Sequence, residues 1–166
     1  MAELTALESK LGEVLGLAMA AQDATAKVGK LVEEEGEHDD LRATLQRMAK
    51  EAKETEERAT DVASELDGKK TAILEKARET KQEAVEMMKT YLGDDADALD
   101  GFEFLTMAEA GEAGHWAVLR ELNQRAGHPD LQSLIDWALP IQERHFQEAL
   151  SGSKTLAAEE DPEGTS

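Results

Sequence analysis

Residues 4–36 read LTALESKLGEVLGLAMAAQDATAKVGKLVEEEG. Along this stretch, residues that can face a protein core recur every three or four positions, at Leu4, Leu7, Leu11, Leu15, Ala18, Gln22, Thr25, Val28 and Val32. This spacing places them on one side of an α-helix. Because no proline precedes Pro129, nothing interrupts such a helix. We expect it to end near Gly36, after a length on the order of 45 Å at about 1.5 Å per residue.

The same period continues in four later stretches of the chain. Acidic caps at His38-Asp39-Asp40 begin a second helix that ends at Asp67-Gly68, and a third runs from Ile73 to Gly93. A fourth begins near Asp100-Gly101 and ends at Gly127. A fifth begins at His128-Pro129, with proline in its first turn, and ends at Ser151-Gly152. No stretch shows the alternation of a strand, so the sequence predicts an all-α protein.

Helix lengths and connections predict how these five helices are arranged. The first two are joined by a tight turn and form an antiparallel hairpin, and the fourth and fifth form another. The third helix, roughly 35 Å long at the same rise, returns the chain along the bundle. We therefore predict a ferritin-like antiparallel four-helix bundle with an additional helical crossover. It forms one domain over residues 1–152, and residues 153–166 are expected to be a disordered acidic tail.

Composition limits the classes of partner. The chain carries 37 acidic against 18 basic side chains, a formal net charge of −19, and no cysteine. Nucleic acids and anionic membranes attract clustered Lys and Arg, so neither is expected to bind. Without cysteine, a metal must be held by carboxylate, His, Gln or Asn side chains. The chain shows no signal segment after Met1 and no run of 18 apolar residues, so we expect a cytoplasmic protein.

Polar residues on the apolar stripes of the last two helices mark the expected site. Glu112 and His115 stand three residues apart, and so do Gln142 and His145, with Glu143 adjacent. A carboxylate and an imidazole at this spacing can bind one metal ion. Antiparallel packing would bring the two pairs together. The sequence has no glycine-rich phosphate loop, nucleophile elbow or HExxH motif, so it predicts no nucleotide cofactor and no hydrolase or kinase activity.

A metal-free interpretation of the same residues stays open. A buried Glu and His can simply hydrogen-bond each other, and an ExxH pair arises easily in a chain rich in Glu. Gly111 and Gly114 flank Glu112, although each glycine costs about 1 kcal/mol relative to Ala in a helix interior. Such glycines indicate the close approach of a neighbouring helix or of a bound group.

Three motifs carry a resemblance to a known family. They are Lys53-Glu54-Thr55-Glu56-Glu57-Arg58, the run Glu109-x-x-Glu112-x-x-x-Trp116-x-x-Leu119, and Gln142-Glu143. On these motifs, residues 10–150 resemble the ferritin-like superfamily, with the nearest likeness to small bacterial stress-associated proteins of the YciF type. The resemblance implies a di-iron-like centre with carboxylates from Glu54, Glu57, Glu109, Glu112 and Glu143.

The chain departs from this family pattern at two places. The first helix offers Gln22 and Asp23 where the family has Glu, and Gln142 stands where a carboxylate is expected. The period of the second helix also places Glu51, Glu54 and Glu57 on a solvated face, beside Lys50, Lys53 and Arg58.

Two functional hypotheses follow. In the first, Glu112, His115 and His145 bind iron, or else manganese or zinc, with Gln142 and Glu109 in support. If active, such a protein would perform iron or oxygen redox chemistry linked to stress protection. The resemblance also implies a homodimer. In the second, the chain is a metal-free helical interaction or self-associating protein, and its polar core layer fixes the register of the helices.

Overall fold

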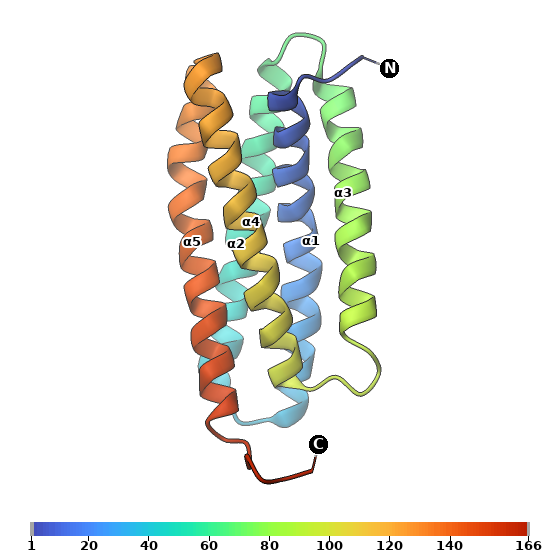
Figure 1. Ribbon diagram of the computed structural model, residues 1–166, viewed down its shortest axis with the longest axis vertical. Helices are drawn as coiled ribbons and strands as arrows, with labels where there is room; N and C mark the ends of the chain where they lie inside the picture. The colour runs from blue at the N-terminus through green and yellow to red at the C-terminus, as the bar shows by residue number, and fades with distance from the viewer. Residues whose placement is uncertain (1, 166) are drawn as a thin grey trace.

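The computed structural model describes residues 2–165, and within them the chain forms five helices and no strand. The helices are α1 (Ala6–Glu35), α2 (Asp39–Glu65), α3 (Lys70–Tyr91), α4 (Ala98–Ala126) and α5 (Pro129–Ala157). Each runs antiparallel to the one before it (Figure 1). The predicted all-α chain of five helices is confirmed. Among the described residues, no helix is both long and apolar enough to cross a membrane.

The helix ends follow local capping rules. Thr5 Oγ1 accepts a hydrogen bond from the Glu8 amide, and the Glu8 carboxylate accepts one from the Thr5 amide, which together begin α1. At the other end Gly36 has a φ of 79°, a left-handed conformation that glycine adopts without steric cost. The same pair of contacts between Asp97 and Asp100 begins α4 two residues before its predicted start.

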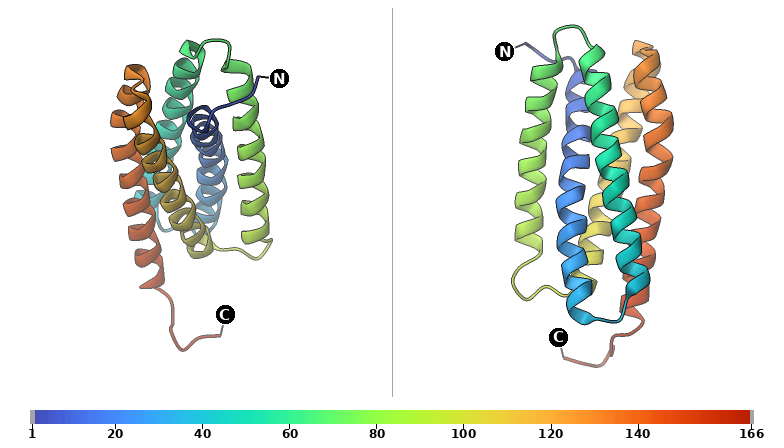
Figure 2. Two further views of the ribbon diagram at one scale, coloured as in Figure 1. Left: turned by 45° about the horizontal axis from the view of Figure 1, so that its top comes forward. Right: turned by 180° about the vertical axis from the view of Figure 1, so that it is seen from behind.

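Four of the helices form the bundle. α1 contacts α2 and α4, and α5 contacts α4 and α2, so that neighbouring helices in the bundle are antiparallel. α2 and α4 run in the same direction, so the chain has to return from the end of α2 to the start of α4. α3 makes this return on the outside of the bundle. Figure 2 shows α3 beside α1 and far from α5. α3 packs mainly on α1, with a smaller contact to α2.

Two glycines let α3 approach α1 closely. A Cβ atom built at Gly16 would lie 2.3 Å from the carbonyl oxygen of Ala77, and one at Gly12 would lie 2.8 Å from Cβ of Lys76. Side chains at both positions would therefore push α3 away. Within residues 2–165, α3 makes no contact of similar extent with α4. The surface between α3 and α4 is left open.

The buried core is divided into two apolar clusters. One contains Leu11, Leu15, Trp116 and Ile135, and the other contains Val28, Met48, Phe102 and Leu105. Trp116 is fully buried. Between members of the two clusters along the chain lie four buried polar residues, and they interrupt the apolar core near the middle of the bundle: Glu109 and Glu112 on α4, and Gln142 and His145 on α5.

The carboxyl end of the domain lies beyond the predicted boundary. α5 continues to Ala157, five residues past Gly152, so the prediction of disorder is wrong for Ser153–Ala157. Leu156 is buried in the second cluster. The ring of Phe102 occupies the space beside Gly152, where a Cβ would lie 2.3 Å from Cε1. Gly152 therefore permits close packing here and does not end the helix.

Candidate functional site

A buried polar layer crosses the bundle between the two apolar clusters. α4 supplies Glu109 and Glu112, which are 1% and 5% exposed, and α5 supplies Gln142 and His145, which are 5% and 2% exposed. Each pair is three residues apart, so both members lie on the inner side of their helix. α2 adds Glu51, whose side chain is 17% exposed. The layer thus joins three helices.

Contacts run through the layer from one helix to the next. The Gln142 side-chain amide donates a hydrogen bond to the Glu109 carboxylate. His145 lies between two acids, with Nε2 3.4 Å from Glu51 Oε1 and Nδ1 3.8 Å from Glu109 Oε2. Burial lowers the pKa of His145, so that its imidazole is neutral at neutral pH.

Glu51 is held by an arginine. Arg144 donates from Nη1 to Glu51 Oε1 at 3.0 Å and from Nη2 to Glu51 Oε2. Burial raises the pKa of Glu51, but the hydrogen bond from Arg144 and the interaction with His145 outweigh it, and the pKa is lowered. Glu51 is therefore an ionised carboxylate whose two oxygens are already engaged.

Glu109 and Glu112 have the opposite electrostatic character. Burial raises the pKa of Glu109 to about 7, although the hydrogen bond from Gln142 opposes this. Burial also raises the pKa of Glu112 well above its ordinary value, and the charge of Glu109 adds to the effect. Within the described residues, Glu112 accepts no hydrogen bond and forms no ion pair. The pair therefore retains a proton near neutral pH.

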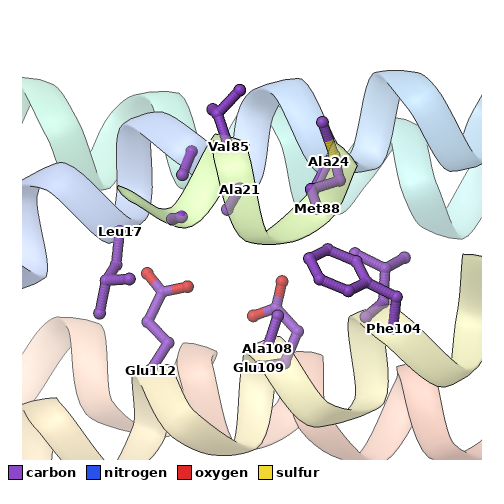
Figure 3. Close-up of a pocket in the computed structure, with 12 residues that line it drawn as sticks. Leu17, Ala21, Ala24, Val85, Met88, Phe104, Ala108, Glu109 and Glu112 are labelled. Carbon is purple, nitrogen blue, oxygen red and sulfur yellow. The ribbon is translucent and has the colours of Figure 1, made fainter. Parts of the chain in front are cut away.

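Both carboxyl groups point into an apolar pocket (Figure 3). Its other walls come from α1, α3 and α4, and they are Leu17, Ala20, Ala21, Ala24, Ala84, Val85, Met88, Phe104, Leu105 and Ala108. The pocket is continuous with a wider groove between α3 and α4, because Leu17, Phe104 and Glu112 line both. The groove has a volume of about 1110 Å³, counting the space open to solvent at its mouth.

The groove has apolar and exposed walls. Met87 on α3 and Met107 on α4 line it, and they are 59% and 46% exposed. Gly111 also lines it, and a Cβ built there would meet nothing within 4 Å. Lys10, Glu13 and other charged residues complete the lining. The structure thus combines an apolar groove with an unpaired carboxyl group at its base.

The structure brings some of the predicted site residues together. Glu109, Gln142 and His145 meet in the layer, and Glu112 lies beside Glu109. His115 does not join them. Its side chain is 41% exposed, and its Nδ1 lies 3.1 Å from Lys10 Nζ and 3.3 Å from a Glu13 oxygen. The expectation that His115 and His145 meet is corrected by this placement.

The remaining predicted residues point outward. Asp23 pairs with Lys81 at 3.5 Å, and Glu54 pairs with Arg58 at 2.8 Å. Glu57 and Glu143 are exposed. For α2 this agrees with the period of its stripe, because Ala52, Thr55 and Ala59 take the buried positions.

The position of Glu51 in the polar layer differs from the solvated face that the helical period predicted for it. Glu51 follows Met48 by three residues and precedes Thr55 by four, and both of those are buried. This position at the edge of the stripe was the available signal.

The residues of the layer do not form the complete di-iron site that the resemblance implies. Such a site takes carboxylates from four helices. On α1, the pocket wall is Leu17 and three alanines, and Glu51 on α2 is bound by Arg144. Among residues 2–165, no three His, Asp or Glu side chains are arranged to hold a metal ion.

Comparisons with models of protein families, with curated proteins and with solved structures find no match for this chain. The likeness to YciF-type proteins, and the homodimer that it implies, stay predictions from the motifs.

Proposed function

We propose that this protein is a helical binding protein that holds a ligand with an apolar body in the groove between α3 and α4. One observation carries the proposal: Met87 and Met107 are both strongly exposed and line the same concave surface. Methionine side chains are flexible and polarisable, and they are frequent at surfaces that adapt to apolar partners. Concave surfaces with apolar walls and a few polar groups are typical ligand sites.

Gly111 supports this proposal. Glycine was expected here to permit the approach of a helix or of a bound group, and no residue that the structure describes fills the space. A glycine in a helix interior costs about 1 kcal/mol relative to Ala. Because Gly111 lines the groove, the space that it leaves is available to a bound ligand.

The polar layer has a structural role in this proposal. Its contacts join α2 to α5 through Glu51 and Arg144, and α5 to α4 through Gln142 and Glu109. Polar groups inside a core favour the register that pairs them, because any other register leaves them unpaired. The layer would therefore fix the wall that α4 presents to the groove.

A neutral apolar dye such as Nile red tests the proposal. We expect it to bind the full chain and to fluoresce more strongly and at shorter wavelength. Met107→Glu places a charge in the groove wall and should abolish this signal. Val118→Glu is the matched control, because Val118 lies on the same helix, is 48% exposed and does not line the groove. Absence of binding, or equal loss in both variants, would contradict the proposal.

Metal binding is the second candidate function, and one observation favours it. Glu109 and Glu112 are neighbouring buried carboxyl groups, and His145 lies 3.8 Å from Glu109. With small side-chain movements these three could ligate iron, manganese or zinc. Metal analysis of protein purified without chelator, followed by Fe(II) titration of wild type and Glu109→Gln, decides this candidate. Absence of metal together with identical titrations would remove it, and with it the iron and oxygen chemistry linked to stress protection.

A further inference from the structure

We propose that the groove selects small amphipathic cations, with a primary ammonium group at Glu112 and an aliphatic or aromatic body along Phe104, Met87 and Met107. This inference rests on the proposed binding function and names the chemical class of its ligand. The juxtaposition that carries it is a buried, unpartnered carboxyl group at the base of an apolar groove.

The described residues give the Glu112 carboxyl group no hydrogen-bond partner, and its oxygens are open to the space of the pocket. It is 5% exposed, and its carboxyl group points into the pocket (Figure 3). Buried polar groups in proteins are nearly always hydrogen-bonded, and a carboxyl group without a partner is costly to bury. An ammonium group carries three N–H donors and a positive charge, and so it would satisfy Glu112 in both respects.

The other charged groups of the groove do not supply this cation. Lys10 forms an ion pair with Glu13 and also contacts His115. Lys76 lies on the same side, where its charge acts on Glu13. The two lysines that line the groove therefore gather around one acid, and Glu83 and Glu112 are left as the other acids of the lining.

The charge of the site fits one monovalent cation. Glu109 lies beside Glu112, and its Oε2 atom accepts from Gln142. Because this buried pair retains one proton near neutral pH, the two groups together carry one negative charge, which a single ammonium group balances. The net charge of −19 also attracts cations to the protein and repels anions.

The depth of the carboxyl group favours a small molecule over a partner helix. The floor and walls around Glu112 include alanines of three helices, among them Ala21, Ala84 and Ala108. The rings of Tyr91 and Phe104 lie 5.6 Å apart and bridge α3 and α4 near the carboxyl end of α3. A helix with its side chains is about 10 Å across and would rest at the groove mouth. A chain-like amine can enter with its head group first.

Three probes of equal length test the inference on the full chain in amine-free buffer: octylammonium, octanol and octanoate. We expect octylammonium to displace Nile red at concentrations about tenfold lower than octanol, a difference of about 1.4 kcal/mol, because its charged head group adds a hydrogen bond to the apolar contacts that both probes make. Octanoate should bind most weakly. Glu112→Gln should raise the octylammonium concentration needed about tenfold relative to the octanol concentration needed by the same variant.

Glu83→Gln is the matched control, because it removes the same charge from an exposed acid of the same groove. Equal loss in both variants would mean general attraction to an acidic surface and would overturn the inference. So would octanoate binding as tightly as octylammonium, or displacement only by a lysine-bearing helical peptide. If Nile red binds but octylammonium shows no preference over octanol, the inference fails and the proposed function stands. If no probe binds, both fail. Circular dichroism establishes that each variant is folded.

Discussion

Glu109 lies one helical turn before Glu112 on α4, and its charge adds to burial in raising the pKa of the Glu112 carboxyl. The two groups lie at the meeting point of the polar layer and the groove. Ionisation of both groups is therefore unfavourable in the folded protein, and the stability of the bundle should depend on pH.

The first prediction concerns pH. A carboxyl group whose pKa is higher in the folded state than in the unfolded chain stabilises the folded protein fully below the unfolded pKa of about 4.5. This stabilisation is lost as the pH rises through the pKa of the folded state, which is about 7 for Glu109. Glu112→Gln removes one such group. We expect the variant to be more stable relative to wild type at pH 8 than at pH 5, because it lacks this destabilising ionisation. Urea unfolding at both pH values measures this. A difference between the two proteins that does not change with pH would contradict it.

A second prediction compares glycines. Gly111→Ala and Gly29→Ala place methyl groups where nothing lies within 4 Å, so each should stabilise the protein by about 1 kcal/mol. Only Gly111→Ala should also weaken Nile red binding, because Gly29 does not line the groove. Gly152→Ala should destabilise by about 1–3 kcal/mol, since its Cβ would lie 2.3 Å from Phe102. Urea midpoints test all three, and stabilisation by Gly152→Ala would refute the packing described here.

A third prediction concerns the arginine that holds Glu51. A double-mutant cycle of Arg144→Gln and Glu51→Gln should give a coupling of about 1–2 kcal/mol, because both carboxylate oxygens accept from Arg144 and Glu51 is mostly buried. The equivalent cycle for Arg58 and Glu54, both more than 40% exposed, should give less than about 0.5 kcal/mol. Similar couplings in the two cycles would show that Glu51 is not specially held.

A fourth prediction concerns the end of α5. Leu156→Ala should cost about 2–4 kcal/mol, because Leu156 is buried against the second apolar cluster. Lys154→Ala, at an exposed position two residues earlier, should have little effect. Thermal unfolding distinguishes the two variants. Equal stabilities would support the original expectation that the chain is disordered from residue 153.

Sequence period predicted the helices well and the site in part. Glycines at 36 and 127 end helices as expected, and the polar residues Glu109, Gln142 and His145 do lie inside. For α4, the predicted buried stripe continued from Glu112 to His115, three residues later. The structure buries Trp116 instead, because at 3.6 residues per turn a step of four lies closer to the same face.

The groove was not predictable from the same patterns. It exists because α3 packs on α1 and stays apart from α4. This position of α3 depends on tertiary contacts at Gly12 and Gly16. From the sequence alone, these two glycines appear only as residues of low helix propensity within a long helix. Glu51 was missed for a related reason, since its partner Arg144 is 93 residues away along the chain.

The docking of α3 through Gly12 and Gly16 also separates two properties that most binding sites combine. The width of the groove is set at positions that do not line it. A larger side chain at either glycine would move one wall outward and leave the carboxyl group and the methionines chemically unchanged. Ligand size and ligand charge can therefore be adjusted independently of each other in this scaffold.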